Sequence, residues 1–297
     1  MPQKVIAAAI QMTTTPVSLD ENVATVRRLI AQAKTNHNVS LIVLPEYWAT
    51  LGMKQVHTFA ETLIPDSSAV SDSNGLQSPP SEAAEPLHSR IQTEMSAIAL
   101  EFGITLVGGT IPTRSLVSGK YYNSCLVYNP LGERIASYNK IHLFKFEGPP
   151  AFDEGQTVVG GEVEPVTVAV SQDKEWNCRL SVCYDMRFPE LYRQESGSYN
   201  MIVVPAAFTV ETGRAHWEVL LRARAIESQS YLIASAQVGT HPVTGRITYG
   251  HSMIIDPWGR VVAEESGDTE SVVVWEMDLD VVKDVRHRLP ALTHHRL

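Results

Sequence analysis

The chain has 297 residues, 44% of them hydrophobic and 19% charged, which is an ordinary composition for a globular protein. A formal net charge of −9 argues against nucleic acid or an acidic membrane surface as the main partner, and no apolar run approaches the ~20 residues that a membrane helix needs. The three cysteines, an odd number in a large chain, do not make a disulfide framework, so we expect a reducing, cytoplasmic location.

The first part of the chain alternates strand and helix signals. KVIAAAIQM is a nearly continuous apolar run, typical of a strand covered on both faces, and we expect no targeting segment before it. Ser18 followed by Glu21 fits a helix capping box. The helix itself is predicted by apolar residues at helical spacing, Val23, Val26, Leu29, Ile30 and Ala33. SLIVLPE predicts the next buried strand, which ends at Glu46.

A stretch of different composition interrupts this pattern. Residues 65–86 are dominated by Pro, Ser, Asp and Gly, which predicts a long, mobile surface loop and not a domain linker. A helix ending at Gly103 is predicted next, with one face lined by Leu87, Ile91, Met95, Ile98, Ala99 and Phe102. ITLVGGTIP then predicts a strand.

Two hairpins and further strand and helix signals follow. YYNSCLVYNPLGERIASYNK and HSMIIDPWGRVVAE each contain a turn signal, at residues 129–132 and 256–259. Strands are predicted in MIVVPAAF, YLIASAQVG and SVVVWEMDLD, and helices in AHWEVLLRARAIESQSY and LDVVKDVRHRL. This alternation predicts an α/β fold with a mixed sheet and helices packed outside it. Because the chain has no internal repeat and no marked composition shift, we expect one domain over residues 1–297.

Four residues that can carry chemistry lie at or near the ends of strand-like runs. Glu46 closes LIVLPE, Lys140 closes RIASYNK, Cys183 closes CRLSVC, and Glu154 lies in the loop EGPPAFDEG. Side chains just past strand ends are where α/β folds gather their sites. Taken singly, each residue also has an ordinary explanation as a solvated acid, a surface lysine or a cysteine that fills the core.

The context of Cys183 favours a nucleophile. An apolar strand leads in, and RFPELYRQ predicts a helix leading out, an arrangement that can expose the side chain and leave the next backbone N–H free to bind an anion. A helix N-terminus or a nearby cation is expected to lower the pKa of the thiol and favour the thiolate. Cys125 and Cys178 fit core positions better, because the first lies within a predicted strand and the second begins one.

Five ordered blocks resemble the nitrilase superfamily of carbon–nitrogen hydrolases, along essentially the whole chain. LIVLPE, YNKIHLF and CYDMRFPEL are similar to the blocks that carry the glutamate, lysine and cysteine of that family. HWEVLLRARAIESQSY and YGHSMIIDPWGRVVAE are similar to downstream blocks of its Nit branch. The resemblance implies a four-layer αββα sandwich, often paired into homodimers that extend the layers.

The resemblance also implies a catalytic triad of Glu46, Lys140 and Cys183, supported by Glu154. An amide carbon is a poor electrophile, so attack needs a thiolate and a charge that stabilises the oxyanion. Glu46 is expected to take the thiol proton, pass it to the leaving group and then activate water against a thioester. Lys140 and the backbone N–H of Tyr184 are expected to stabilise the oxyanion. Glu154 is expected to hold the ammonium in place, because a buried lysine otherwise tends to lose its proton.

Within the Nit branch, the downstream blocks most resemble the amidases that act on deaminated glutathione. This implies hydrolysis of that 2-oxo acid amide to 2-oxoglutarate and cysteinylglycine. The alternative is an ω-amidase acting on 2-oxoglutaramate, whose relatives more often carry ARAVDNQ where this chain has ARAIESQ. Arg187 is a candidate for bidentate binding of a substrate carboxylate, or else it pairs with Asp185 or Glu190 in the turn after Cys183.

Other classes of function find less support. A non-catalytic binding scaffold of this fold is expected to lack a triad member, and none is missing. LVGGTIP matches neither glycine-rich nucleotide-binding pattern. The ten histidines show no zinc-ligand spacing, and His294-His295 fit a solvated tail. The expected partner is a small-molecule amide, with no cofactor, metal, membrane or nucleic acid involved.

Overall fold

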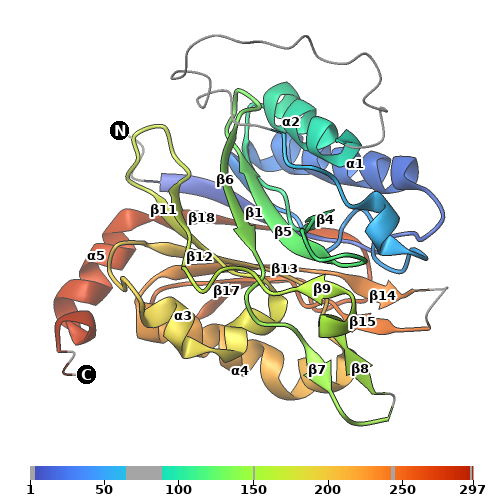
Figure 1. Ribbon diagram of the computed structural model, residues 1–297. Coiled ribbons are helices and arrows are strands. Elements are labelled where there is room, and N and C mark those ends of the chain that lie inside the picture. The colour runs from blue at the N-terminus through green and yellow to red at the C-terminus, as the bar shows by residue number, and fades with distance from the viewer. Residues whose placement is uncertain (1–3, 65–88, 150, 242–244, 295, 297) are drawn as a thin grey trace, which may run out of the picture.

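Helices cover both outer faces of two central β-sheets (Figure 1). The computed structural model describes residues 4–64, 89–149, 151–241, 245–294 and 296, so the loop predicted at residues 65–86 lies outside the described residues. In these ranges no helix has both the length and the hydrophobicity required to cross a bilayer. The order of the layers, helix, sheet, sheet, helix, confirms the predicted αββα sandwich.

The larger sheet has eight strands in the order β18-β1-β2-β3-β5-β4, with β6 and β9 also paired to β5. Neighbours β1, β2 and β3 are parallel to one another, whereas β18 is antiparallel to β1 and β5 is antiparallel to β3, β4 and β6. The strands are β1 (Lys4–Gln11), β2 (Leu41–Val43), β3 (Thr105–Val107), β4 (Ile111–Arg114), β5 (Tyr121–Tyr128), β6 (Arg134–Asn139), β9 (Val158–Val159) and β18 (Ser271–Asp278).

The smaller sheet has six strands in the order β10-β11-β12-β13-β16-β17, and its central strands β11, β12 and β13 are parallel. Its strands are β10 (Thr167–Ala169), β11 (Asn177–Leu180), β12 (Met201–Ala206), β13 (Tyr231–Ala236), β16 (Met253–Ile255) and β17 (Val261–Glu264). Two separate antiparallel ribbons are formed by β7 (Lys145–Phe146) with β8 (Phe152–Asp153), and by β14 (Val238–Thr240) with β15 (Ile247–Tyr249).

Five helices complete the layers in the described ranges. Helices α1 (Leu19–His37) and α2 (Arg90–Phe102) pack on the outer face of the larger sheet. Helices α3 (Pro189–Arg193) and α4 (Val210–Ser228) lie on the opposite side of the molecule, against the smaller sheet (Figure 1). Helix α5 (Leu279–Arg288) follows β18 and adds apolar side chains to the same core as α4.

The sequence of α1 explains its position. The Ser18 side chain accepts a hydrogen bond from the Glu21 backbone N–H at 3.3 Å, so the predicted N-cap is confirmed. All five residues of the predicted apolar stripe are buried, and they face the larger sheet. Burial of such a stripe contributes most of the stability of a helix in a protein, because an isolated helix is marginal in water.

The apolar run in β1 is explained by burial on both faces. Ala7 and Ala9 point into the core between the sheets, which they share with Val203 and Ile233 of the smaller sheet. Ala8 and Ile10 point into the second core, beneath α1 and α2. Successive side chains of a strand face opposite sides, so a central strand must be apolar at every position.

Three predicted elements differ in extent. ITLVGGTIP forms β3 and β4, separated at Gly108 and Gly109, and YLIASAQVG forms β13 and β14 in different sheets. Helix α4 begins at Val210, before the predicted segment.

Gly109 has φ +56, and a Cβ there would lie 2.1 Å from the carbonyl oxygen of Pro45. The glycine therefore lets the segment after β2 pass close to the strand break, which positions Glu46.

Candidate active site

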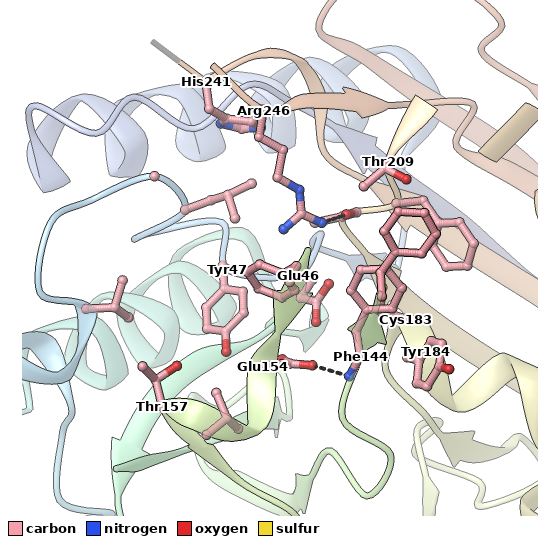
Figure 2. Close-up of a pocket in the computed structure, with 18 of the residues that line it drawn as sticks. Glu46, Tyr47, Phe144, Glu154, Thr157, Cys183, Tyr184, Thr209, His241 and Arg246 are labelled. Carbon is pink, nitrogen blue, oxygen red and sulfur yellow. Dashed lines mark hydrogen bonds between the residues drawn. The ribbon is translucent and has the colours of Figure 1, made fainter. Parts of the chain in front are cut away.

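The four side chains predicted to carry chemistry come from four different loops and line one pocket. Figure 2 labels three of them, Glu46, Glu154 and Cys183. Glu46 follows β2, Lys140 follows β6, Glu154 begins a short 3₁₀ turn after β8, and Cys183 begins another after β11. Their exposed fractions are 3%, 2%, 6% and 7% in that order. The explanations as solvated acids and a surface lysine are therefore wrong.

Lys140 lies between the two glutamates. Its Nζ is 2.9 Å from Glu46 Oε1 and 2.8 Å from Glu154 Oε2. Burial by itself lowers the pKa of Lys140, but the charges of Glu154, Glu46 and Cys183 outweigh it and hold the pKa well above the ordinary value. The side chain is thus a fixed positive charge beside the cysteine.

Cys183 occupies a sharp turn with φ +48, a conformation that non-glycine residues adopt rarely and at a cost of about 1–3 kcal/mol. Glu46, Lys140 and the backbone N–H of Ala207 all act on the pKa of its thiol. Burial raises the pKa of Cys183, Glu46 raises it further, and Lys140 opposes them without prevailing. The prediction of a lowered thiol pKa is therefore wrong, because desolvation is the largest effect on this side chain. A raised pKa favours the neutral thiol over the thiolate at this position.

Hydrogen bonds at its backbone and at its carboxylate hold Glu46 in place. The Gln237 side chain donates to the Glu46 carbonyl oxygen at 3.0 Å, and the next backbone N–H, of Tyr47, donates to Thr110 Oγ1 at 2.9 Å. Asn123 Nδ2 donates to Glu46 Oε1 at 2.9 Å. Oε1 of the carboxylate thus accepts from both Asn123 and Lys140, which fixes the direction of the side chain.

Glu154 is held by hydrogen bonds to Phe144, which directly precedes β7, and the residue after it is held by Lys120. Its backbone N–H donates to the Phe144 carbonyl at 2.9 Å, and its carboxylate accepts from the Phe144 N–H at 2.8 Å. Lys120 Nζ donates to the carbonyl of Gly155 at 2.6 Å. The predicted placement of Glu154 beside Lys140 is seen in the structure.

Two residues of the site were not singled out from the sequence. Asn123, on β5, reaches both Glu46 and Glu154. Asp185 is fully buried, and its carboxylate accepts from the Val182 N–H at 2.9 Å and from the His142 N–H at 3.0 Å. Asp185 therefore ties the cysteine turn to the segment after Lys140. The available signal was a short acidic side chain within a turn, a residue type that often binds nearby backbone N–H groups.

Tyr184 and Arg187 line the pocket, as expected of binding residues. The Arg187 guanidinium lies over the rings of Tyr184, at 5.5 Å, and Phe208, at 5.6 Å, and its Nη2 is 3.2 Å from His216 Nδ1. In the described part of the chain it forms no ion pair with Asp185 or Glu190. The alternative of a purely structural pairing of Arg187 with one of those acids is wrong.

Cys125 and Cys178 are fully buried in the core between the sheets, away from the pocket lining. Burial raises the pKa of Cys125 to about 12 and that of Cys178 well above its ordinary value. The prediction that these two cysteines fill the core is confirmed.

The pocket has a volume of about 650 Å³, within the usual range for small-molecule sites. Aromatic side chains form much of its wall, namely Phe144, Phe146, Phe152, Tyr184 and Phe208. The lysine and arginines of the lining are Lys140, Arg187 and Arg246. His241 also lines the pocket, and burial together with the charge of Arg246 lowers its pKa to about 4. Over the residues that can be described, no group of three or more His, Cys, Asp or Glu is placed to hold a metal ion.

An αββα sandwich with a buried cysteine, carboxylate and ammonium at one pocket defines a class of hydrolytic enzymes. The family model for carbon–nitrogen hydrolases matches residues 6–287, and the chain belongs to this family.

Individual relatives agree with this assignment. The chain is 37% identical to a deaminated glutathione amidase of Synechocystis over 293 residues, 97% of each chain. It is 36% identical to the human omega-amidase NIT2 over 222 residues, 72% of this chain and 76% of the relative. Nit3 of Saccharomyces cerevisiae, described as a member of branch 10 of the nitrilase superfamily, has a similar structure, with a TM-score of 0.79 and 28% identity over 97% of this chain and 95% of that one.

The Glu154→Gln substitution tests the electrostatic role of the second glutamate. Because the folded-state pKa of Lys140 lies above its ordinary value of 10.5, the ion cluster stabilises the fold fully below that pH and loses the contribution as the pH rises through the folded-state pKa. Removing the Glu154 carboxylate takes away one of the charges that raise the pKa of Lys140, so burial then lowers this pKa. We expect the alkaline limb of the kcat/KM profile to move to lower pH, and kcat at neutral pH to fall about tenfold or more.

The matched control is Glu162→Gln, which removes a carboxylate from an exposed position. It is expected to leave both the profile and kcat unchanged. An unmoved alkaline limb in Glu154→Gln would contradict the electrostatic role.

Proposed function

We propose that the protein is an amidase that cleaves the C–N bond of a small 2-oxo acid amide through a thioester on Cys183. The observation that carries this proposal is that Cys183 lines the same pocket as the ion pair of Lys140 and Glu46, whose Nζ and Oε1 atoms are 2.9 Å apart. This is a nucleophile, a base and an oxyanion stabiliser in one place.

In the first half of the reaction, Cys183 attacks the amide carbonyl carbon while Glu46 takes the thiol proton. The fixed charge of Lys140 stabilises the tetrahedral oxyanion, and we assign the second oxyanion contact to the backbone N–H of Tyr184. Glu46 then gives the proton to the leaving nitrogen, the C–N bond breaks, and an amine departs. The acyl group remains on the sulfur as a thioester.

In the second half, Glu46 takes a proton from water as the water oxygen attacks the thioester carbonyl. The second oxyanion collapses, the C–S bond breaks, and the sulfur recovers the proton from Glu46. The acid departs, and the site is restored with no net change in its charge. Glu154 holds the Lys140 ammonium throughout. This chemistry uses no metal or organic cofactor.

The substrate that we favour is deaminated glutathione, hydrolysed to 2-oxoglutarate and cysteinylglycine. Its support is the full-length similarity to the Synechocystis relative of that name and the cationic Arg187 in the pocket, which we assign to a substrate carboxylate. The second candidate is 2-oxoglutaramate, favoured by the similarity to the human omega-amidase over a shorter part of the chain.

The proposed reaction also bears on the location and the domain organisation of the protein. We propose a cytoplasmic location, since the reaction needs Cys183 as a reduced thiol, and a single functional domain over residues 1–297.

We also propose a homodimer that forms through the outer face of α4. This face exposes Val219 and Ile226, seven residues apart, and Ile226 lies against Gly259, which follows the exposed Trp258 in the chain. A mass twice that of the chain by light scattering is the expected result, and the mass of a single chain would contradict it.

Steady-state turnover of the two amides decides the substrate. We expect kcat/KM for deaminated glutathione to exceed that for 2-oxoglutaramate, and Cys183→Ala to abolish both activities. The matched control is Cys125→Ala, which removes a buried thiol from outside the pocket and is expected to keep kcat. A clear preference for 2-oxoglutaramate would overturn the substrate proposal, and full activity in Cys183→Ala would overturn the mechanism.

A further inference from the structure

Asn123, on β5, contacts three of the four residues predicted to carry chemistry. Its side-chain Nδ2 donates to Glu46 Oε1 at 2.9 Å and to Glu154 Oε1 at 3.4 Å, and its backbone carbonyl accepts from the Lys140 N–H at 2.9 Å. Asn123 is fully buried and is not among the residues that line the pocket. It can therefore act on the reaction through these charged side chains, and not by contact with a substrate.

The orientation of the Asn123 amide follows from its two acidic neighbours. An ionised carboxylate only accepts hydrogen bonds, so the amide NH2 group, and not the carbonyl oxygen, has to face Glu46 and Glu154. Within the described ranges, Asn123 Oδ1 has no hydrogen-bond donor. An unpaired buried carbonyl is unfavourable, so the fold keeps this amide at a cost to its stability. Such a cost is typical of functional positions.

The two glutamates differ in which of their carboxylate oxygens are bound. Figure 2 shows these two carboxylates close together. On Glu154, Oε1 accepts from Lys140 and Asn123, and Oε2 accepts from Lys140 and from the Phe144 N–H, both at 2.8 Å. On Glu46, Lys140 Nζ and Asn123 Nδ2 both bind Oε1, each at 2.9 Å. A carboxylate oxygen has about two lone-pair sites, so Oε1 of Glu46 is fully used, whereas neither of these donors holds Oε2.

This difference indicates which atom can move a proton. In the proposed reaction the base takes a proton from Cys183, gives it to the leaving nitrogen and then takes one from water, so it needs an oxygen that is not already bound by two donors. Glu46 offers Oε2, whereas each oxygen of Glu154 is bound twice. Without the Asn123 amide, Lys140 alone would hold Oε1 of Glu46, and the carboxylate could turn more freely about its terminal bond.

We propose that Asn123 is a positioning residue, which binds Glu46 Oε1 and so keeps Oε2 directed at Cys183 as the oxygen that takes and returns the proton. This inference rests on the proposed function, because the role of Glu46 as the base belongs to that proposal. It separates the two glutamates by function, with Glu46 as the base and Glu154 as the fixed partner of Lys140.

Asn123→Leu tests the proposal, because leucine is close to asparagine in size and shape but has no donor. We expect kcat on the amide substrate to fall about 10- to 100-fold, the loss of a hydrogen bond to a charged group, with little change in KM. The acidic limb of the kcat/KM profile is expected to move to higher pH by about one unit, since the carboxylate anion loses a donor that stabilises it. Asn123→Ala removes the same donor with a smaller side chain, and it is measured in the same way if the leucine variant does not fold.

Asn200→Leu is the matched control. Asn200 also makes two hydrogen bonds, accepting from the Asn177 N–H at 3.0 Å and donating to the Glu175 carbonyl at 2.7 Å, but it does not line the pocket. Its loss is expected to lower the free energy of unfolding and to leave kcat and the acidic limb unchanged. An unmoved acidic limb in folded Asn123→Leu or Asn123→Ala protein, or a rise in KM with kcat unchanged, would overturn the inference.

Alkylation of Cys183 by iodoacetamide separates this outcome from that of the proposed function. In this reaction the sulfur bonds to the methylene carbon, iodide leaves, and the thiol proton passes to Glu46, so no amide hydrolysis is required. We expect the alkylation rate, followed by mass spectrometry of the Cys183 peptide, to fall about 10- to 100-fold in Asn123→Leu and to stay unchanged in Asn200→Leu. Equal rates in wild type and Asn123→Leu would overturn the inference. A wild-type protein that is alkylated but hydrolyses neither amide would overturn the proposed function, while slower alkylation of Asn123→Leu would still support the positioning role.

Discussion

A buried ammonium held between two carboxylates is the interaction on which the rest of the site depends. Lys140 lies within 2.9 Å of both Glu46 and Glu154, and all three are almost fully buried. A charge in such a place costs several kcal/mol unless partners compensate it, so removal of one partner leaves the others unfavourable. The three loops that carry these residues are therefore fixed relative to one another, and this fixes the pocket wall.

Two members of this cluster, Glu46 and Lys140, also act on the pKa of Cys183. Burial and Glu46 raise the pKa of Cys183, which favours the neutral thiol. In the reaction that we propose, the thiol therefore loses its proton as it attacks the substrate, and Lys140 stabilises the oxyanion. The turn at φ +48 and the buried Asp185 hold Cys183 at the wall of the pocket that Glu46 also lines.

Much of this arrangement could be predicted from local sequence. Capping residues and apolar spacing predicted α1, and strand ends predicted where Glu46, Lys140 and Cys183 would lie. The break at Gly108 and Gly109 could not be predicted, because its reason is the close approach of Pro45. The thiol pKa and the contacts of Asp185 and Asn123 depend on burial and on partners far away in the chain, which no local pattern records.

In the proposed reaction the acyl group passes through the sulfur of Cys183. The most direct measurement is mass spectrometry of the enzyme quenched in acid during turnover of deaminated glutathione, followed by peptide mapping. We expect a 2-oxoglutaryl group on the peptide that contains Cys183, and we expect hydroxylamine to release it as it releases a thioester. Product formation with no acylated peptide, or with the acyl group on another residue, would contradict it.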